Sequence, residues 1–380
     1  MTMHRLEASQ KDYAWGSRSA IQDHAGIGTA GEPLAEIWYG AHPSGPARLE
    51  DGRTLEELIR AEGPAVLGAD VAERFGGALP FLVKLIAPGQ AVSLQVHPRA
   101  ERAREGHTAQ LADPSRERLF VDPHHKPEQI LALTTFEGLV GLRPVDEAAE
   151  VLGRLDHPLP RAARVALVTG GEAAVPRALA LLAQASVADV DELVALARPL
   201  AAGEGDPAAS TVLELAEQYP GDPGVAVSLM LRRVRLEPGD SVLVASGVPH
   251  AYLSGLALEV MANSDNVFRL GLTAKRVDVE ESIANLLAAP AVVNRPHRPA
   301  GSDTGAPAEF RLDVHDLGSG EVAIAGPGPR VVVRLSGAGP IRDDSRRIAL
   351  PQGGAVFLPH GSHAVAEGSG RIAVVSVPAT

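Results

Sequence analysis

The sequence contains no cysteine in its 380 residues, and aromatic residues account for only 3% of it. Without cysteine the chain can form neither a disulfide nor a thiolate metal site, so any metal would be held by histidine, carboxylate, amide or water. Hydrophobic residues make up 45% of the chain. With so few aromatics among them, we expect a core built mainly from Leu, Val, Ile and Ala.

Long apolar segments and an excess of positive charge are also missing. No apolar run approaches the roughly 20 residues that span a bilayer, and the polar sequence after Leu6 lacks the apolar core of a signal peptide. The formal net charge of -12 repels nucleic acid and anionic membranes. We therefore expect a cytoplasmic protein with neither of these partners, in which a few converging Lys and Arg side chains would still bind a small anion.

The texture of the sequence changes along the chain, and the length favours two or three domains of about 150 residues each. Short apolar runs between Gly and Pro predict strands, whereas apolar residues spaced at three and four predict helices. One helix is expected behind Thr54 as its N-cap, and Pro199 is expected to end another. We predict a mainly β protein in five segments: the first part of a β domain (1–144), an α-helical insertion domain (145–222), the second part of that β domain (223–290), a linker (291–307) and a small C-terminal β domain (308–380).

One pattern occurs twice: a Gly turn, a short strand, a second Gly turn and then a histidine. The first copy runs from Asp240 to His250 and the second from Gly354 to His363. The pattern resembles the second motif of cupins, which are double-sheet jelly rolls. It predicts two cupin domains, with chance recurrence in a β-rich chain as the alternative. Because His363 has no nearby His-x-His partner, we expect the second barrel to bind no metal.

The first half of a cupin metal site would supply two ligands from one strand. Gln95 and His97 alternate along such a strand, so their side chains share one face. With His250 and a carboxylate they form a nitrogen and oxygen set that suits a divalent first-row cation, zinc above all. Generic cupin spacing favours Glu101 as the carboxylate, whereas position at a strand start favours Glu128. Glu101 lies in a charge-rich run that is typical of a solvated surface.

Several longer segments are more specific than these short patterns. They are Tyr13-Ala14-Trp15-Gly16, Ala35-Glu36-Ile37-Trp38, Gly40-Ala41-His42-Pro43, Ser93-Leu94-Gln95-Val96-His97-Pro98, His125-Lys126-Pro127-Glu128 and the run from His250 to Lys275. In this order they resemble the type I mannose-6-phosphate isomerases. The resemblance covers about Tyr13 to Asn285, while the helical and C-terminal regions match only in position and texture. Two departures, Arg99 and Ala274, fall on no expected ligand.

The resemblance implies a zinc-dependent enzyme of two cupin domains, with one Zn²⁺ per chain. Its implied reaction interconverts mannose 6-phosphate and fructose 6-phosphate through an enediol intermediate. The implied zinc ligands are Gln95, His97, Glu128 and His250, a set that selects Glu128 over Glu101. Arg269 matches the catalytic arginine of the family, and the positions that match its pocket are Lys84, Ser93, Lys126, Tyr252, Glu259, Asp265 and Lys275.

The chemistry of this reaction agrees with these residue types. Moving a proton between C1 and C2 needs an acid/base group beside the carbons and positive charge beside the oxygen that becomes negative. The sequence does not decide which group moves the proton. Lys126, two residues from an implied zinc ligand, is the catalytic candidate, and Glu259 and Asp265 are its rivals. His42, His124 and His360 are expected at the surface or in the core rather than as ligands.

The expected partner is a small-molecule sugar phosphate, and the expected state is a monomer. Carbohydrate metabolism follows from the resemblance, with either mannose breakdown or GDP-mannose biosynthesis as the direction. Two rival functions stay open at this level. One is another metal-dependent cupin enzyme, such as an iron oxygenase, and the other is a non-catalytic sugar-binding protein with two cupin domains.

Overall fold

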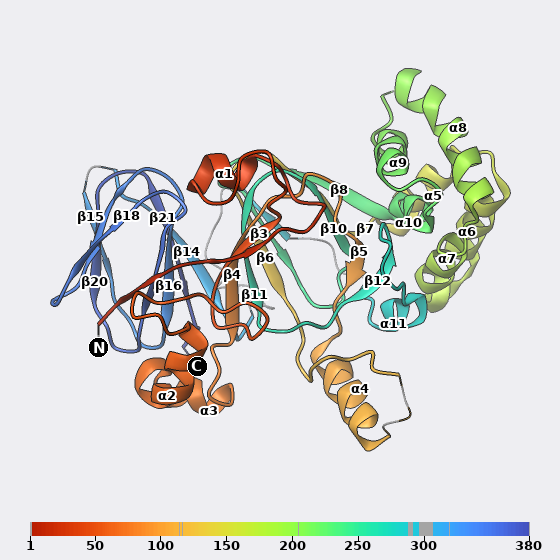
Figure 1. Ribbon diagram of the computed structural model, residues 1–380. Helices are drawn as coiled ribbons and strands as arrows, with labels where there is room; N and C mark the ends of the chain where they lie inside the picture. Colours follow the sequence, from red (N-terminus) through yellow and green to blue (C-terminus); the bar gives the residue numbers. More distant parts are fainter. Residues whose placement is uncertain are drawn as a thin grey trace.

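The computed structural model describes residues 2–379 apart from 114, 116, 204, 288–291, 296–306 and 319. Four antiparallel β-sheets follow one another across the molecule, and a block of helices covers one end (Figure 1). The structure is therefore mainly β, as the sequence predicts.

Two of the sheets face each other across an apolar cluster that includes Ile130, Val140 and Val244. The five-stranded sheet has the order β12-β5-β10-β7-β8, and the seven-stranded sheet the order β13-β9-β6-β11-β4-β3-β2. The strands of the first are β5 (Leu94–Val96), β7 (Phe136–Leu142), β8 (Leu231–Leu236), β10 (His250–Ser254) and β12 (Phe268–Gly271). Those of the second are β2 (Ser9–Lys11), β3 (Glu36–Tyr39), β4 (Phe81–Ile86), β6 (Glu128–Ala132), β9 (Ser241–Val244), β11 (Ala257–Ala262) and β13 (Val292–Asn294).

Alternation along the strands assigns each side chain to one face of its sheet. On β10, Ala251 and Leu253 join the apolar cluster beneath the helices, whereas Tyr252 joins the cluster between the two sheets. On β11, Leu258 and Val260 belong to the cluster that reaches the C-terminal sheets. Glu259, between them, therefore points the other way, into the space between the two facing sheets.

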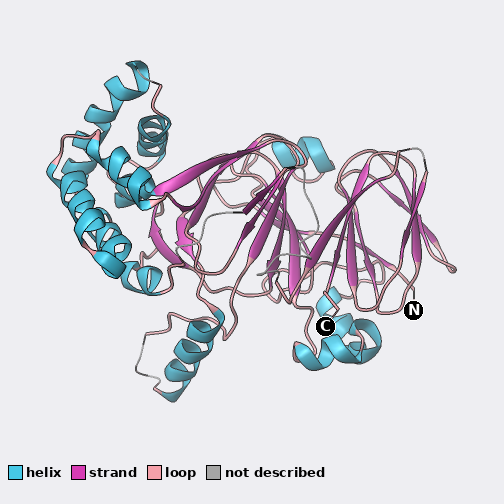
Figure 2. Ribbon diagram, turned by 180° about the vertical axis from the view of Figure 1, so that it is seen from behind, coloured by secondary structure: helices cyan, strands magenta, loops and turns pink. Residues whose placement is uncertain are grey.

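The helices between β7 and β8 pack on the outer face of the five-stranded sheet (Figure 2). They are α5 (Val145–Gly153), α6 (Pro158–Thr169), α7 (Ala174–Leu182), α8 (Val187–Gly203), α9 (Pro207–Gln218) and α10 (Pro223–Val227), with short 3₁₀ turns at Gly171–Ala173 and Ser228–Met230. The expectation that Pro199 ends a helix is wrong, because it lies inside α8. Proline has no N–H, so Pro199 cannot donate the helical hydrogen bond to the carbonyl of Ala195. Both residues are exposed, so water can bind that carbonyl instead.

The C-terminal residues form the other two sheets, with the orders β1-β19-β16-β21-β14 and β15-β20-β17-β18. A cluster that includes Val332, Ile341 and Val356 lies between them, and another that includes Phe357 joins them to the seven-stranded sheet. Their strands are β1 (His4–Leu6), β14 (Arg311–Asp316), β15 (Glu321–Ile324), β16 (Arg330–Arg334), β17 (Gly339–Arg342), β18 (Arg347–Leu350), β19 (Ala355–Leu358), β20 (Ala364–Glu367) and β21 (Arg371–Ser376).

Two short strands lie elsewhere than the predicted segments place them. β1 pairs with β19, with His4 opposite Phe357, so the N-terminus lies beside the C-terminal sheets (Figures 1 and 2). β13, inside the stretch predicted as a linker, pairs with β9 at the edge of the seven-stranded sheet. Apart from 292–295 and 307, that stretch lies outside the described residues.

The remaining helices are α1 (Ala20–Ala25), α2 (Leu55–Leu67), α3 (Ala69–Arg74), α4 (Ala100–Ala112) and α11 (Val279–Ala284). α2 begins after the predicted N-cap, Thr54, whose Oγ1 accepts a hydrogen bond from the Glu57 amide at 3.1 Å. In return the Glu57 carboxylate accepts one from the Thr54 amide at 2.7 Å. This reciprocal pair satisfies two amide groups that the first turn of a helix leaves free.

Removal of this cap should destabilise the protein. Thr54→Ala removes the hydroxyl acceptor and should lower the free energy of unfolding by about 1 kcal/mol, as is usual for N-cap residues. Thr54→Ser keeps an acceptor oxygen and should lie much closer to the starting protein. Equilibrium urea unfolding followed by circular dichroism measures both, and equal midpoints for the two variants would show that the hydroxyl makes no contribution.

Candidate active site

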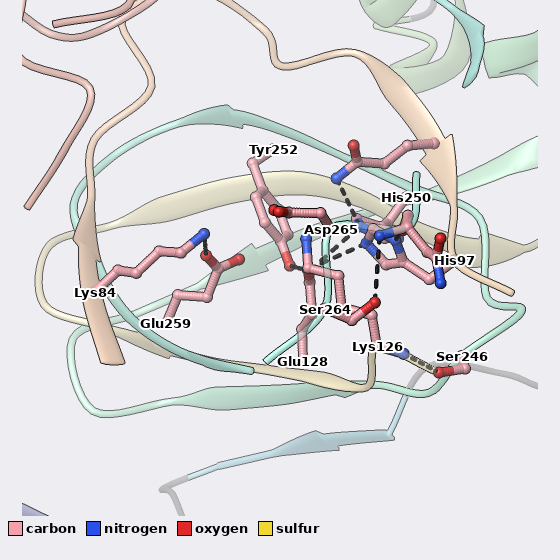
Figure 3. Close-up of polar contacts among 12 residues, drawn as sticks. Lys84, His97, Lys126, Glu128, Ser246, His250, Tyr252, Glu259, Ser264 and Asp265 are labelled. Atoms are coloured by element: carbon pink, nitrogen blue, oxygen red, sulfur yellow. Dashed lines mark hydrogen bonds and ion pairs between the residues drawn. The ribbon is translucent and has the colours of Figure 1, made fainter. Parts of the chain in front are cut away.

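Three potential metal ligands meet between the two facing sheets. Glu128 begins β6 of the seven-stranded sheet, His250 begins β10 of the five-stranded sheet, and His97 follows β5. All three side chains are buried, and their ligand atoms lie within 4.8 Å of one another. Glu128 Oε1 lies 3.1 Å from His97 Nε2, and Glu128 Oε2 lies 3.4 Å from His250 Nε2 (Figure 3). The amide nitrogen of Gln95 lies 3.1 Å from His250 Nε2, so its carboxamide borders the same cluster.

Backbone carbonyls hold the two imidazoles with the same nitrogen facing inward. His97 Nδ1 lies 2.7 Å from the Asn266 carbonyl, and His250 Nδ1 lies 3.0 Å from the Val248 carbonyl. Because a carbonyl only accepts hydrogen bonds, each Nδ1 carries the proton and each Nε2 presents a lone pair to Glu128. Burial and Lys126 together lower the pKa of His97 to about 4, against the opposing effect of Glu128. The neutral imidazole that results is the form that binds metals.

The geometry around His97 fits a cation. Its Nε2 is buried and has no hydrogen-bond partner among the described residues, although a carboxylate oxygen lies 3.1 Å away. Two lone pairs that face each other at this distance repel unless a positive charge lies between them. The donor set of imidazole nitrogens and carboxylate oxygen matches the ligands that zinc takes in catalytic sites.

The Glu128 carboxylate has further partners. Lys126 Nζ lies 3.1 Å from Oε1, and the Tyr252 hydroxyl donates to Oε2 at 2.9 Å. Burial alone would raise the pKa of Glu128, but the charge of Lys126 outweighs it and holds that pKa well below its usual range. Burial and the neighbouring carboxylate raise the pKa of Tyr252. Glu128 is therefore ionised, whereas Tyr252 keeps its proton.

The structure distinguishes Glu101 from Glu128, the two candidates for the carboxylate of the cluster. Glu101 lies in the first turn of α4 and is exposed, whereas Glu128 is 1% exposed and lies in the cluster. The charge-rich run that contains Glu101 forms a helix outside the β-sheets (Figure 1).

The cluster opens into a pocket of about 500 Å³ between the two sheets. Most of the side chains predicted from the sequence line it, and the other two, His97 and His250, lie in the cluster itself. Those that line the pocket are Lys84, Ser93, Gln95, Lys126, Glu128, Tyr252, Glu259, Asp265, Arg269 and Lys275. The structure thus brings all twelve to one place, from both sheets and from the loops between their strands.

A buried chain of charges forms one wall of the pocket. Lys84 Nζ lies 3.1 Å from Glu259 Oε2 and 3.8 Å from Glu36 Oε2, and the Trp38 indole donates to Glu36 at 2.6 Å (Figure 3 shows Lys84 and Glu259). These residues lie on the neighbouring strands β3, β4 and β11. Lys84 on β4 lies opposite Trp38 on β3 and opposite Glu259 on β11. Burial raises the pKa of Glu259 to about 7 against the opposing effect of Lys84. Burial would lower the pKa of Lys84, but Glu259 and Glu36 raise it above its ordinary value, so the ammonium stays charged.

A second wall contains Asp265, with a partner that the sequence did not assign to it. His42 Nδ1 accepts a hydrogen bond from the Ser44 amide at 3.1 Å, so Nε2, 3.3 Å from Asp265 Oδ1, carries the proton. This hydrogen bond lowers the pKa of Asp265. His42 lies in the core with both nitrogens satisfied, as expected, but it lines the pocket as well. Its place in the segment Gly40-Ala41-His42-Pro43 was the one hint of this role.

Another residue missed from the sequence, Asn266, joins the loops that carry the site. Its side chain accepts from the Val121 amide at 2.7 Å and donates to the carbonyls of Asp122 at 2.7 Å and His124 at 2.8 Å. The backbone carbonyl of Asn266 accepts the hydrogen bond from His97 Nδ1. One asparagine therefore holds both the His97 ring and the loop that leads to Lys126.

Arg269 lies on β12 opposite Gln95, on the far side of the pocket from the Lys84 wall. Its Nε is buried and has no hydrogen-bond partner among the described residues. Burial lowers the pKa of Arg269 from its ordinary value, against the opposing effect of Asp278, but an arginine guanidinium stays charged at neutral pH. The pocket is thus lined by a cation whose Nε has no partner among the described residues.

Known proteins share both sequence and fold with this chain. The family profile described as "Phosphomannose isomerase type I, catalytic domain" matches residues 3–145. Mannose-6-phosphate isomerase from Salmonella typhimurium is 34% identical, over 98% of this chain and 99% of its own length. The enzyme of the same name from Escherichia coli is 33% identical with the same coverage. The one from Homo sapiens is 34% identical over 72% of this chain and 70% of its own length.

Solved structures agree. A variant of phosphomannose isomerase from Salmonella typhimurium has a TM-score of 0.89 and 32% identity, with both chains covered completely. A mannose 6-phosphate isomerase bound with zinc and yttrium has a TM-score of 0.88 and 32% identity, also over the full length of both chains.

The antiparallel sheets and the buried His-Glu-His cluster, together with these relatives, identify the chain as an isomerase. It belongs to the type I phosphomannose isomerase family, as the sequence resemblance predicts. A search for membrane-crossing segments found no helix of sufficient length and apolarity within the described part of the chain.

The two competing carboxylates give a direct test of the metal cluster. Glu128→Ala should reduce bound zinc from about one equivalent to close to none, because it removes the anionic donor of the cluster and leaves only neutral groups to bind the cation. Glu101→Ala, on the exposed helix, should keep the full equivalent. Both are measured by elemental analysis after dialysis against zinc-containing buffer and then against metal-free buffer. The reverse result would place the metal at the generic cupin position.

Proposed function

We propose that this chain interconverts mannose 6-phosphate and fructose 6-phosphate with one zinc ion bound per chain. The observation that carries the proposal is the buried cluster of His97, Glu128 and His250 at a pocket that also contains Arg269 and Lys126. The relatives named mannose-6-phosphate isomerase support the substrate. The pocket volume of about 500 Å³ lies in the range of small-molecule sites.

Four side chains would hold the ion: Gln95, His97, Glu128 and His250. When bound, zinc supplies a Lewis acid that polarises the substrate carbonyl and orients its neighbouring oxygen. The inward lone pairs of both imidazoles and the ionised carboxylate support this assignment. Gln95 contributes no charge, so the ion would keep a net positive charge at the pocket floor.

The proton transfer between C1 and C2 falls to side chains of the pocket walls. Glu259, with a pKa raised to about 7, accepts and returns a proton near neutral pH. Lys126, 3.1 Å from Glu128, supplies an ammonium donor beside the metal ligands, where the enediol oxygens would lie. Asp265 stays ionised next to His42 and is suited to accept a hydrogen bond from a sugar hydroxyl.

The opposite side of the pocket suits the phosphate. Arg269, Lys275 and Ser93 all line it, and a guanidinium can bind phosphate oxygens through two parallel hydrogen bonds. The alternative role of Arg269 is to stabilise negative charge on the enediolate, in which case Lys275 and Ser93 would bind the phosphate. Lys84 and Tyr252 complete the substrate pocket as neighbours of Glu259 and Glu128.

The domain division is part of the same proposal. We infer that the predicted segments 1–144 and 223–290, without β1 and with β13 added, form one cupin domain around the pocket. Residues 145–222 are a helical insertion domain, and 308–380, joined by β1, form a second, metal-free cupin-like domain. The apolar clusters between each pair of sheets support this division. The monomeric state and the cytoplasmic location stay predictions from the sequence.

A coupled assay that converts fructose 6-phosphate to mannose 6-phosphate tests the function. The protein should turn over, lose activity after treatment with a chelator, and regain it when zinc is restored. Absence of activity in the zinc-loaded protein would favour a sugar-binding protein. Turnover that needs iron and oxygen would favour an oxygenase instead.

Replacement of the pocket arginine should separate catalysis from metal binding. Arg269→Ala should retain zinc and lose about 100-fold or more in kcat/KM, because it removes a fixed positive charge from the reacting region. Arg269→Lys keeps the charge but not the planar donor pair, and it should recover part of the loss. Wild-type rates in Arg269→Ala would refute the role of this residue.

A further inference from the structure

The last turns of the helical segment reach the substrate pocket. Tyr219, at the end of α9, lines it, and its hydroxyl donates to the Ala91 carbonyl at 2.6 Å. The Gln218 side chain accepts from the Ala91 amide at 2.7 Å, and Gln90 donates to the Gln218 carbonyl at 3.2 Å. These bonds join the end of α9 to the loop that leads into β5, the strand of Gln95.

Asp222, three residues further on, binds a second loop of the pocket. Its side chain is the N-cap of α10 and accepts from the Gly224 amide at 2.7 Å. The same oxygen accepts from the Leu272 amide at 2.8 Å, and the other oxygen lies 3.3 Å from the Thr273 amide. One carboxylate therefore binds the first turn of a helix and a loop that lies about 50 residues away in sequence.

The loop that it binds is strained. Leu272 has a φ of 56°, and it is the one non-glycine residue with positive φ in the described part of the chain. A branched side chain is disfavoured in this left-handed region, and such a conformation persists only where the surroundings hold it. Leu272 is buried. The packing is so close that a Cβ on Gly224 would lie 2.7 Å from the Leu272 amide nitrogen.

This loop continues directly into the pocket, because Thr273 and Lys275 line it. We propose that Asp222 is a positioning residue that holds the strained loop and so places Thr273 and Lys275 against the sugar phosphate. The helical segment then forms part of the substrate site rather than an appendage of the sheets. The inference rests on the proposed function for its substrate, but not for the structural effect of Asp222 on the loop.

The same helical segment offers a matched control. Asp206 is the N-cap of α9, where its Oδ1 accepts from the Ala208 amide at 2.8 Å and the Ala209 amide at 3.1 Å. Its second oxygen pairs with Arg154 at 2.6 Å. Asp206 caps a helix as Asp222 does, but it does not line the pocket. A loss of stability alone would therefore affect both aspartates, whereas a loss of positioning would affect only Asp222.

Steady-state kinetics on the zinc-loaded full chain compares Asp222→Ala with Asp206→Ala. Asp222→Ala should raise KM for fructose 6-phosphate about 10-fold or more with a smaller change in kcat, since a displaced binding loop weakens substrate binding. Asp206→Ala should lower the melting temperature with KM unchanged, and both should keep their zinc. Asp222→Asn retains one acceptor oxygen and should recover part of the KM change. Equal KM values for the two alanine variants would overturn the inference.

Limited proteolysis provides a readout that does not need activity. Lys275 and Arg276 are exposed on this loop, so its release should speed trypsin cleavage there at least several-fold in Asp222→Ala and not in Asp206→Ala. Mass spectrometry identifies the cut. If Asp222→Ala fails to fold, the same comparison with Asp222→Asn decides. An inactive wild-type protein with faster cleavage in the variant would refute the proposed function and keep the positioning role, whereas unchanged cleavage would refute the positioning role.

Discussion

The candidate active site depends on the burial of one carboxylate. Glu128 is 1% exposed, and a charge that is removed from water in this way is stable only among compensating partners. The compensating partners are Lys126, two residues earlier in the chain, and Tyr252 from β10. His250, also from β10, and His97, from the end of β5, present lone pairs that a cation would bridge to the carboxylate. Because Glu128 lies on the seven-stranded sheet and the β10 and β5 partners on or beside the five-stranded sheet, the cluster exists only when the two sheets face each other. The apolar residues between them thus determine the polar site.

The same constraint explains how an acidic chain presents positive charge. The net charge is -12, yet Lys84, Lys126, Arg269 and Lys275 line one pocket. Two of these cations, Lys84 and Lys126, are already paired with buried carboxylates, whereas Arg269 keeps a free Nε among the described residues. The local field that an anionic substrate meets is therefore set by a few buried side chains, and the surface charge contributes little at this depth.

Local rules predict the ligand cluster, whereas the pocket residues, such as Arg269 and Glu259, follow only from the resemblance to the family. Alternation places Gln95 and His97 on one strand face, and the charge-rich run around Glu101 indicates a solvated helix, which is where α4 lies. The pairing of β1 with β19 is different in kind, since the register of a strand depends on an edge more than 300 residues away. Likewise no local pattern connects Asp222 to Leu272 or His42 to Asp265, because each contact exists only once distant loops have packed together. At Pro199 a local rule fails: proline usually ends a helix, but here it lies inside α8, where an exposed position lets water replace the lost hydrogen bond.

The pocket is held in two independent ways, at its floor and at its rim. The floor is the buried cluster, whose geometry follows from the facing sheets and from backbone carbonyls that fix the imidazoles. The rim near Lys275 follows instead from a strained turn at Leu272 that a helix N-cap holds in place. Strain of this kind needs a rigid partner, and α10 supplies one because Val225, Ala226 and Val227 are fully buried beneath the helices. In the proposed function, metal binding thus depends on the two sheets, and substrate binding depends in part on the helical segment.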